Sequence, residues 1–65
     1  MAKSYYENGN LESEQNYHNG RLWGEAKYYY PDGKLQFIFQ NKNDVPVAVK
    51  EHDQEGNLIF QTVYQ

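Results

Sequence analysis

Tyr30-Pro31-Asp32-Gly33-Lys34-Leu35 is the second of three similar stretches in this chain of 65 residues. The first stretch is Tyr6-Glu7-Asn8-Gly9-Asn10-Leu11, and the third is Asp53-Gln54-Glu55-Gly56-Asn57-Leu58. Their glycines follow one another after 24 and then 23 residues. A regular interval of this size is typical of repeat proteins. Glycine and asparagine between apolar segments favour tight turns, so the pattern predicts a small array of β-hairpins.

Two further turns are expected between these three. Asn19-Gly20 is one of the strongest short hairpin signals, and the polar stretch 41–44 is the corresponding turn of the second repeat. Gly20 precedes Gly33 by 13 residues, and Asn43 precedes Gly56 by 13 residues, which aligns Asn43 with Gly20. With this alignment, one deletion between Leu35 and Asn43 explains the shorter second interval.

The segments between the turns alternate apolar and polar residues, as half-buried strands do. The clearest is 35–40, where Leu35, Phe37 and Phe39 are expected to face inward. Residues 45–51 place three valines on one face, around Pro46. We therefore predict an all-β fold, an antiparallel β-hairpin repeat meander of about six strands in a single extended twisted sheet. The expected domain is 1–65, with about two and a half repeats at 5–28, 29–51 and 52–65.

The composition leaves little material for a core. Hydrophobic residues make up 38% of the chain and aromatic residues 17%. A chain this short buries only about 60% of the surface that its unfolded form exposes, so additional stabilisation is expected. Because the sequence has no cysteine, disulfides cannot supply it, and oligomerisation is the remaining source.

The charge pattern argues against several classes of partner. The net charge is −3, and the six basic residues are scattered along the chain. Nucleic acid and anionic membranes require clustered cations, so neither is expected as a ligand. An apolar run of about 18 residues, as a membrane span needs, does not occur, nor does the apolar core of a signal peptide. These patterns predict a cytoplasmic protein.

Three segments carry a resemblance to a known family, residues 5–11, Tyr17-His18-Asn19-Gly20-Arg21-Leu22-Trp23-Gly24 and residues 28–35. In these segments the chain resembles the MORN repeat variant proteins of bacteria, whose members are often described as antitoxin components. The resemblance weakens after residue 35. The resemblance implies a run of hairpins laid side by side and a role as an interaction scaffold, with lipid, membrane or protein partners in different members.

The sequence offers no arrangement that carries chemistry. His18 and His52 lack the spacing to other ligands that a metal site shows. The only candidate hydroxyl nucleophiles, Ser4, Ser13 and Thr62, lie in no nucleophile motif. The glycines lie between strands and open no helix that would bind phosphate. We therefore predict no catalytic residues, no cofactor, no metal and no enzymatic activity.

Function is expected instead on the sheet surface. Because consecutive strand residues point to opposite faces, the aromatic side chains cannot all be buried. Trp23 is expected to fill the space beside Gly24 and Ala26. The predicted protein-binding face consists of Glu12, Glu14, Trp23, Glu25 and Tyr29. The predicted edge or dimer strand consists of Leu58, Ile59, Phe60, Val63 and Tyr64.

Three functions follow from these surfaces and stay open at this point. The first is a non-catalytic module that binds a protein, which its acidity suggests is basic, as an inhibitor or antitoxin-like partner. The second is a self-assembling repeat protein that forms a homodimer through its last strand or its apolar face. The third is a platform for glycans or small ligands, on which aromatic rings stack against sugars.

Overall fold

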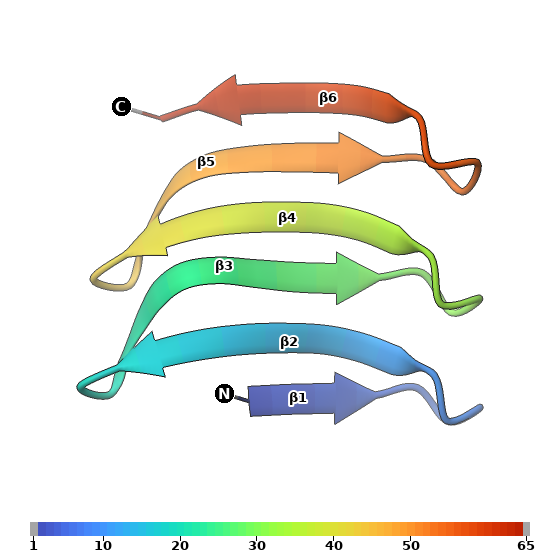
Figure 1. Cartoon of the computed structure of the whole chain (residues 1–65), viewed down its shortest axis with the longest axis horizontal. Coiled ribbons are helices and arrows are strands. Elements are labelled where there is room, and N and C mark those ends of the chain that lie inside the picture. Colours follow the sequence, from blue (N-terminus) through green and yellow to red (C-terminus); the bar gives the residue numbers. More distant parts are fainter. Residues whose placement is uncertain (1, 65) are drawn as a thin grey trace.

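The computed structural model describes residues 2–64, which form one six-stranded sheet. Its strands are β1 (Ala2–Tyr5), β2 (Leu11–His18), β3 (Arg21–Tyr29), β4 (Leu35–Lys42), β5 (Val45–His52) and β6 (Leu58–Val63). Each strand pairs antiparallel with the next in sequence, so β1 and β6 form the two edges (Figure 1). Residues 2–64 contain no helix. The prediction of an all-β antiparallel meander is therefore confirmed.

The three glycine turns share one hydrogen-bonding pattern, and all lie at the same end of the sheet (Figure 1). In the second turn the Tyr30 amide donates to the carbonyl of Lys34 over 2.7 Å, and the Gly33 amide donates to the carbonyl of Tyr30 over 2.9 Å. Gly33 has a φ of 92°, a left-handed conformation that side chains disfavour. Glycine thus recurs at this position because the turn requires it.

The two turns at the opposite end correct the predicted repeat alignment. Asn19 and Gly20 have φ values of 52° and 78°, and Asn43 and Asp44 have values of 53° and 69°. Asn43 therefore corresponds to Asn19, and Asp44 rather than Asn43 corresponds to Gly20. This alignment keeps the spacing of 24 residues through the turn, so the deletion does not lie between Leu35 and Asn43 as expected.

The missing residue lies in β5. Leu22 pairs with Tyr17 and Ala26 pairs with Gln15, so four steps along β3 lie opposite two steps along β2. β3 therefore has a bulge of two extra residues. In β5 the corresponding step, from Pro46 to Ala48, has one extra residue opposite β4. Because alternation signals only that a strand is present, the sequence pattern did not indicate where a bulge had changed in length.

The strand register gives the sheet an aromatic face, which we define by the residues that the cross-strand pairs align on one side. Only two hydrophobic residues among 2–64 are buried, Ala26 and Val49. The sheet measures 31 × 25 × 10 Å, and because 10 Å is the thickness of one layer, no segment within residues 2–64 covers the face. The residues of the aromatic face are Ser13, Gln15, Ala26, Tyr28, Phe37, Phe39, Val49, Glu51, Phe60 and Thr62.

Ring contacts hold the middle of the aromatic face together. The centre of the Phe39 ring lies 5.7 Å from that of Tyr28, in an edge-to-face arrangement, and 5.8 Å from that of Phe37. We expected Trp23 to fill the space beside Gly24 and Ala26, but its side chain is 43% exposed. It lies 5.9 Å from the ring of His18, near the end of the β2–β3 hairpin. The small residue Ala26 instead pairs across the sheet with Phe39.

The three valines of β5 do not form one inward row. Val49 is buried, whereas Val45 is 51% exposed. The bulge between Pro46 and Ala48 separates them, and an extra residue reverses the side to which the following side chains point.

The opposite side of the sheet is the charged face. Cross-strand pairs identify the residues on this side, for example Glu14 with Lys27 and Ile38 with Lys50. Basic and acidic side chains alternate from Lys3 through Glu14 to Lys27 on β1–β3. Beyond β3 the alternation ends, because Ile38 stands between Lys27 and Lys50. Within residues 2–64, no helix is long and apolar enough to cross a bilayer.

Candidate protein-interaction surface

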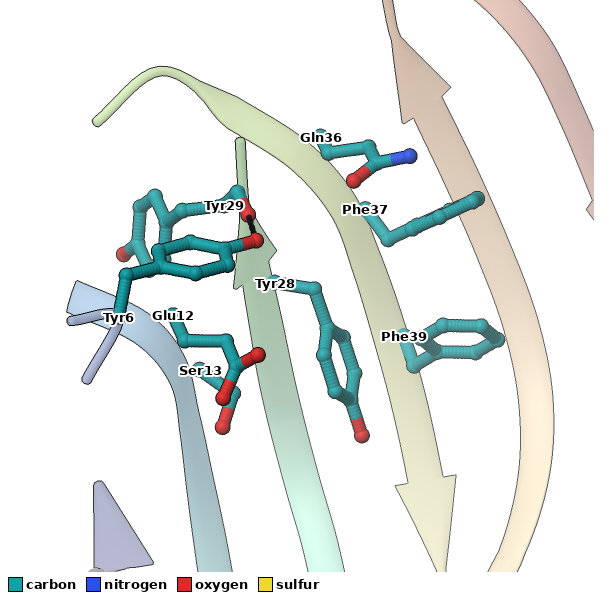
Figure 2. A pocket seen from close by; sticks show the side chains of 8 residues that line it. All are labelled: Tyr6, Glu12, Ser13, Tyr28, Tyr29, Gln36, Phe37 and Phe39. Atoms are coloured by element: carbon teal, nitrogen blue, oxygen red, sulfur yellow. Dashed lines mark hydrogen bonds between the residues drawn. The ribbon is translucent and has the colours of Figure 1, made fainter. Parts of the chain in front are cut away.

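The aromatic face is hollowed between β2 and β4. The hollow has a volume of about 510 Å³ and is open to solvent on one side. Figure 2 shows the side chains that line it and the hydrogen bond that closes one end. The lining residues are Tyr6, Glu12, Ser13, Tyr28, Tyr29, Gln36, Phe37 and Phe39.

A repeated bulge shapes the rim of this hollow. The pairing of β1 with β2 skips Glu12, and the pairing of β3 with β4 skips Gln36. The two residues are 24 positions apart and therefore occupy the same place in successive repeats. Ile59 is skipped in the same way in β6. Bulges re-aim side chains, and here two of them place polar groups beside aromatic rings.

Tyr6 closes the end of the hollow. Its hydroxyl donates a hydrogen bond to the backbone carbonyl of Tyr29, which joins the first turn to the end of β3 (Figure 2). Ser13 is buried, and its small side chain leaves room at the floor of the hollow below Tyr28 and Phe37. The result is an apolar surface between rings, with polar groups at its edge.

The acidic residues of the predicted binding face differ in their pairing. Glu14 lies 4.0 Å from the ammonium group of Lys3, and Glu25 lies 3.8 Å from that of Lys27. Within residues 2–64, no cation lies within ion-pair distance of Glu12. Glu12 is exposed at the rim of the aromatic hollow, so its negative charge is available to a ligand.

Tyr29 and Glu14 form a direct contact. The Tyr29 hydroxyl donates a 2.6 Å hydrogen bond to Oε1 of Glu14. Burial, the hydrogen bond and the carboxylate charge, in that order, raise the pKa of Tyr29 to about 12. Tyr29 is thereby held neutral as a hydrogen-bond donor, and its hydroxyl is occupied within the chain.

The predicted binding face is therefore divided in the structure. Glu14 and Glu25 line one small hollow of about 140 Å³ on the charged face, together with Lys27. Trp23 is 43% exposed and lies toward the turn of the β2–β3 hairpin. Glu12 lines the aromatic hollow, and Tyr29 lines it as well while its hydroxyl donates to Glu14.

Sequence reasoning did not select the rings that line this hollow. Tyr6 and Tyr28 were noted only as part of a general aromatic excess, and Phe37 and Phe39 were predicted to face inward but not to line a binding site. The alternation in residues 35–40 was the available signal, because it placed Phe37 and Phe39 on one side of a strand. The register with β3, which brings Tyr28 beside Phe37, is a long-range pairing that local pattern does not specify.

The predicted edge strand lies at the open edge of the sheet, opposite β1 (Figure 1). All five predicted residues are large, apolar or aromatic, and exposed. The exposed fractions are 47% for Leu58, 55% for Ile59, 52% for Phe60, 68% for Val63 and 56% for Tyr64.

The groups that line the aromatic hollow are of kinds that bind ligands. Among residues 2–64, no three histidine, aspartate or glutamate side chains come together as a metal site would require. One carboxylate, one serine and one glutamine stand among aromatic rings in the hollow. Such a surface can stack on, and hydrogen bond to, a ligand.

Comparison with known families assigns the repeats. The sequence profile of the MORN repeat variant family matches residues 1–19 and 24–43. This chain belongs to the MORN repeat variant family. The matched segments cover the β1–β2 hairpin and most of the β3–β4 hairpin, where the hollow lies. MORN repeats are generally protein- or membrane-interaction modules, which is consistent with a non-catalytic role. No curated protein and no solved structure matches the chain.

Proposed function

We propose that this MORN repeat protein is a non-catalytic binding module that recognises a basic, partly apolar segment of another protein on its aromatic face. The observation that carries the proposal is the uncovered hollow with Glu12 at its rim. Uncovered aromatic surface of this kind marks interaction sites in soluble proteins.

The rings set the shape of the ligand. Tyr28 and Phe37 expose apolar ring surface to the hollow, against which the aliphatic part of an arginine or a neighbouring aliphatic side chain can pack. A guanidinium group also gains from lying over an aromatic ring. The hollow of about 510 Å³ is large enough for one or two such side chains.

The charges of the chain determine which charge a ligand should carry. Glu12 supplies an unpaired carboxylate at the rim, and the chain as a whole carries a net charge of −3. Both favour a cationic segment, and the net charge also accelerates its approach. Glu14 and Glu25 contribute less, because lysines lie beside them.

A more specific form of this proposal is antitoxin-like inhibition. Enzymes that act on nucleic acids have basic surfaces, and a module that binds such a surface would block access to it. The acidic net charge and the family resemblance favour this form. We propose it as one case of the general function.

A peptide-display selection tests the proposal. Peptides that contain arginine or lysine next to an aliphatic or aromatic residue should be enriched on the immobilised protein. Substitution of Glu12→Gln should weaken a selected peptide about tenfold, the worth of one charge-assisted contact. Glu55→Gln, which removes the same charge at a distant exposed turn, is the matched control and should change affinity little.

Two results would contradict the proposal. One is enrichment of acidic peptides or of none, and the other is equal affinity of the Glu12→Gln variant and wild type. Amide shifts at Phe37 and Phe39 on peptide addition would locate the site. A glycan array separates the alternative ligand class, because the aromatic hollow is also the surface on which a sugar would stack.

A further inference from the structure

The outer edge of β6 has backbone groups that no residue among 2–64 pairs. The Tyr64 amide donates to the carbonyl of Val47 over 2.9 Å, so the backbone of Tyr64 points toward β5. Hydrogen-bonded and non-hydrogen-bonded pairs alternate along an antiparallel ladder. The backbone amides and carbonyls of Thr62 and Phe60 therefore also point toward β5. Those of Gln61 and Val63 point away from β5, toward the open edge.

The two edge strands differ in how well they are protected against pairing with a further strand. β1 has four residues and includes Lys3, and a charged side chain on a short edge strand discourages further pairing. β6 has six residues, Leu58–Val63, and none of them is charged. β6 is thus the edge that is open to another strand.

The rest of the fold indicates where an added strand would begin. In β2 and β4 the residue after the bulge, Ser13 or Phe37, is where pairing with the following strand starts. Phe60 holds this place in β6, after the bulge at Ile59. Residues 60–64 are therefore the segment available for pairing.

We propose that this segment pairs with the same segment of a second copy, antiparallel about a two-fold axis at Thr62. In this register Gln61 of each copy exchanges backbone hydrogen bonds with Val63 of the other, which are the two residues whose groups point outward. Thr62 faces Thr62 of the second copy, and Phe60 faces Tyr64. A two-fold interface is the commonest form of self-association.

The side chains suit this register. Aromatic pairs and threonine pairs are among the favourable cross-strand neighbours, and no charged residue faces another. Phe60 is 52% exposed and Tyr64 is 56% exposed, so both have surface to bury. Pairing would also join the two aromatic faces into one, because Phe60 and Thr62 belong to that face. This supplies apolar contact to a chain that buries little by itself.

Single cysteines test the register, because the chain has no cysteine of its own. Thr62→Cys places two thiols in a non-hydrogen-bonded pair, with Cα atoms about 4.5 Å apart, within the range that a disulfide spans. Gln61→Cys is the matched control. In the proposed register the two residues 61 are offset by two positions along the strands. Their Cα atoms would lie roughly 8 Å apart, which is too far for a disulfide.

We expect the Thr62→Cys variant to form a disulfide dimer under mild oxidation at least tenfold faster than the Gln61→Cys variant. The contrast is informative because Gln61 is exposed and Thr62 is half-buried. Random collision would therefore favour the opposite order. Equal rates, or faster reaction of the Gln61→Cys variant, would overturn the proposed register.

Light scattering tests the association without cysteine. The wild type should approach twice its monomer mass of 7.7 kDa as its concentration rises from micromolar to millimolar. Val63→Lys should raise the dissociation constant at least tenfold, and Gln54→Lys, with the same charge change in an exposed turn, should not. A monomer at every concentration, or open chains formed by β6 on β1, would refute the pairing.

The β6 pairing and the binding hollow involve different parts of the sheet. The hollow lies over β2, β3 and β4, whereas the two-fold pairing involves only β6. A monomeric Val63→Lys variant that still binds the selected peptide would uphold the binding function. Loss of peptide binding in the Glu12→Gln variant would leave dimer formation unchanged.

Discussion

The hydroxyl of Tyr30 donates a 2.9 Å hydrogen bond to the backbone carbonyl of His52, next to the following turn. Tyr6 makes the equivalent bond to the carbonyl of Tyr29, one repeat earlier. In the first two glycine turns, the first residue thus ties its turn to the end of the next hairpin. At the third turn this residue is Asp53, which instead accepts hydrogen bonds from the amides of Glu55 and Asn57.

Removal of one tyrosine hydroxyl should measure the strength of this link. Tyr30→Phe leaves the ring in place but leaves the carbonyl of His52 without its side-chain donor, and it should cost about 1 kcal/mol. Urea unfolding monitored by circular dichroism gives the value. Tyr5→Phe is the matched control, because Tyr5 is 61% exposed, and it should cost less than half as much. Equal costs would show that the link contributes nothing specific.

Ionisation of Tyr29 should make the protein sensitive to alkali. Its pKa is raised to about 12 by burial and by Glu14, from 10.0 in the unfolded chain. Because the folded pKa is the higher one, this contribution to stability is complete below pH 10 and is lost as the pH rises through 12.

Tyrosinate absorbance provides the measurement. The difference between titrations of wild type and Tyr29→Phe should show one tyrosine with a midpoint near pH 12. In a Glu14→Gln background the midpoint should fall, because the carboxylate contributes both its hydrogen bond and its charge. A midpoint near 10 in the wild-type protein, or an unchanged midpoint in that background, would contradict the assigned contact.

Asp44 should stabilise the fold through its hydrogen bond rather than through its charge. Its Oδ1 accepts a 2.7 Å hydrogen bond from the Leu22 amide, and its carboxylate lies 3.6 Å from the guanidinium group of Arg21, with both side chains more than half exposed. Exposed ion pairs contribute little. Asp44→Asn keeps an acceptor oxygen and a residue that tolerates a φ of 69°, so it should cost about 0.5 kcal/mol or less.

Asp44→Ala is the contrasting variant. It removes the acceptor and places alanine in a left-handed conformation, so it should cost roughly 1–3 kcal/mol. Thermal or urea unfolding of the two variants side by side gives the comparison. An Asp44→Asn cost as large as that of Asp44→Ala would mean that the ion pair, and not the hydrogen bond, joins the two hairpins.

Two phenylalanines on the same face should differ in their importance. Phe39 pairs with both buried hydrophobic residues, Ala26 and Val49, and contacts the rings of Tyr28 and Phe37. Phe39→Ala should cost about 3 kcal/mol or more, enough to unfold a large share of a domain this small. Phe60 is 52% exposed, so Phe60→Ala should cost under about 1 kcal/mol in the dilute monomer.

Circular dichroism at low micromolar concentration distinguishes the two phenylalanine variants. Phe39→Leu provides a second measurement, since it keeps most of the buried volume and should retain the fold. If Phe60→Ala were the more damaging substitution, the centre of the core would lie nearer the β6 edge than the burial indicates.

The amino-acid sequence by itself determined the number, order and direction of the strands. Glycine and asparagine adopt positive φ at little cost, so turns such as Asn19-Gly20 are encoded locally and can be identified without knowledge of contacts. Short turns between consecutive strands then leave an antiparallel meander as the simple arrangement. The exposed apolar character of β6 was likewise visible in its residues.

Only the tertiary structure decided which residues share a face and where the binding hollow lies. The bulges at Glu12, Gln36 and Ile59 are defined by a mismatch between two strands, and neither strand reveals it alone. One residue more or less in a strand reverses every side chain beyond it. The bulges therefore separate Glu12 from Glu14, on which the sequence had predicted a single binding face.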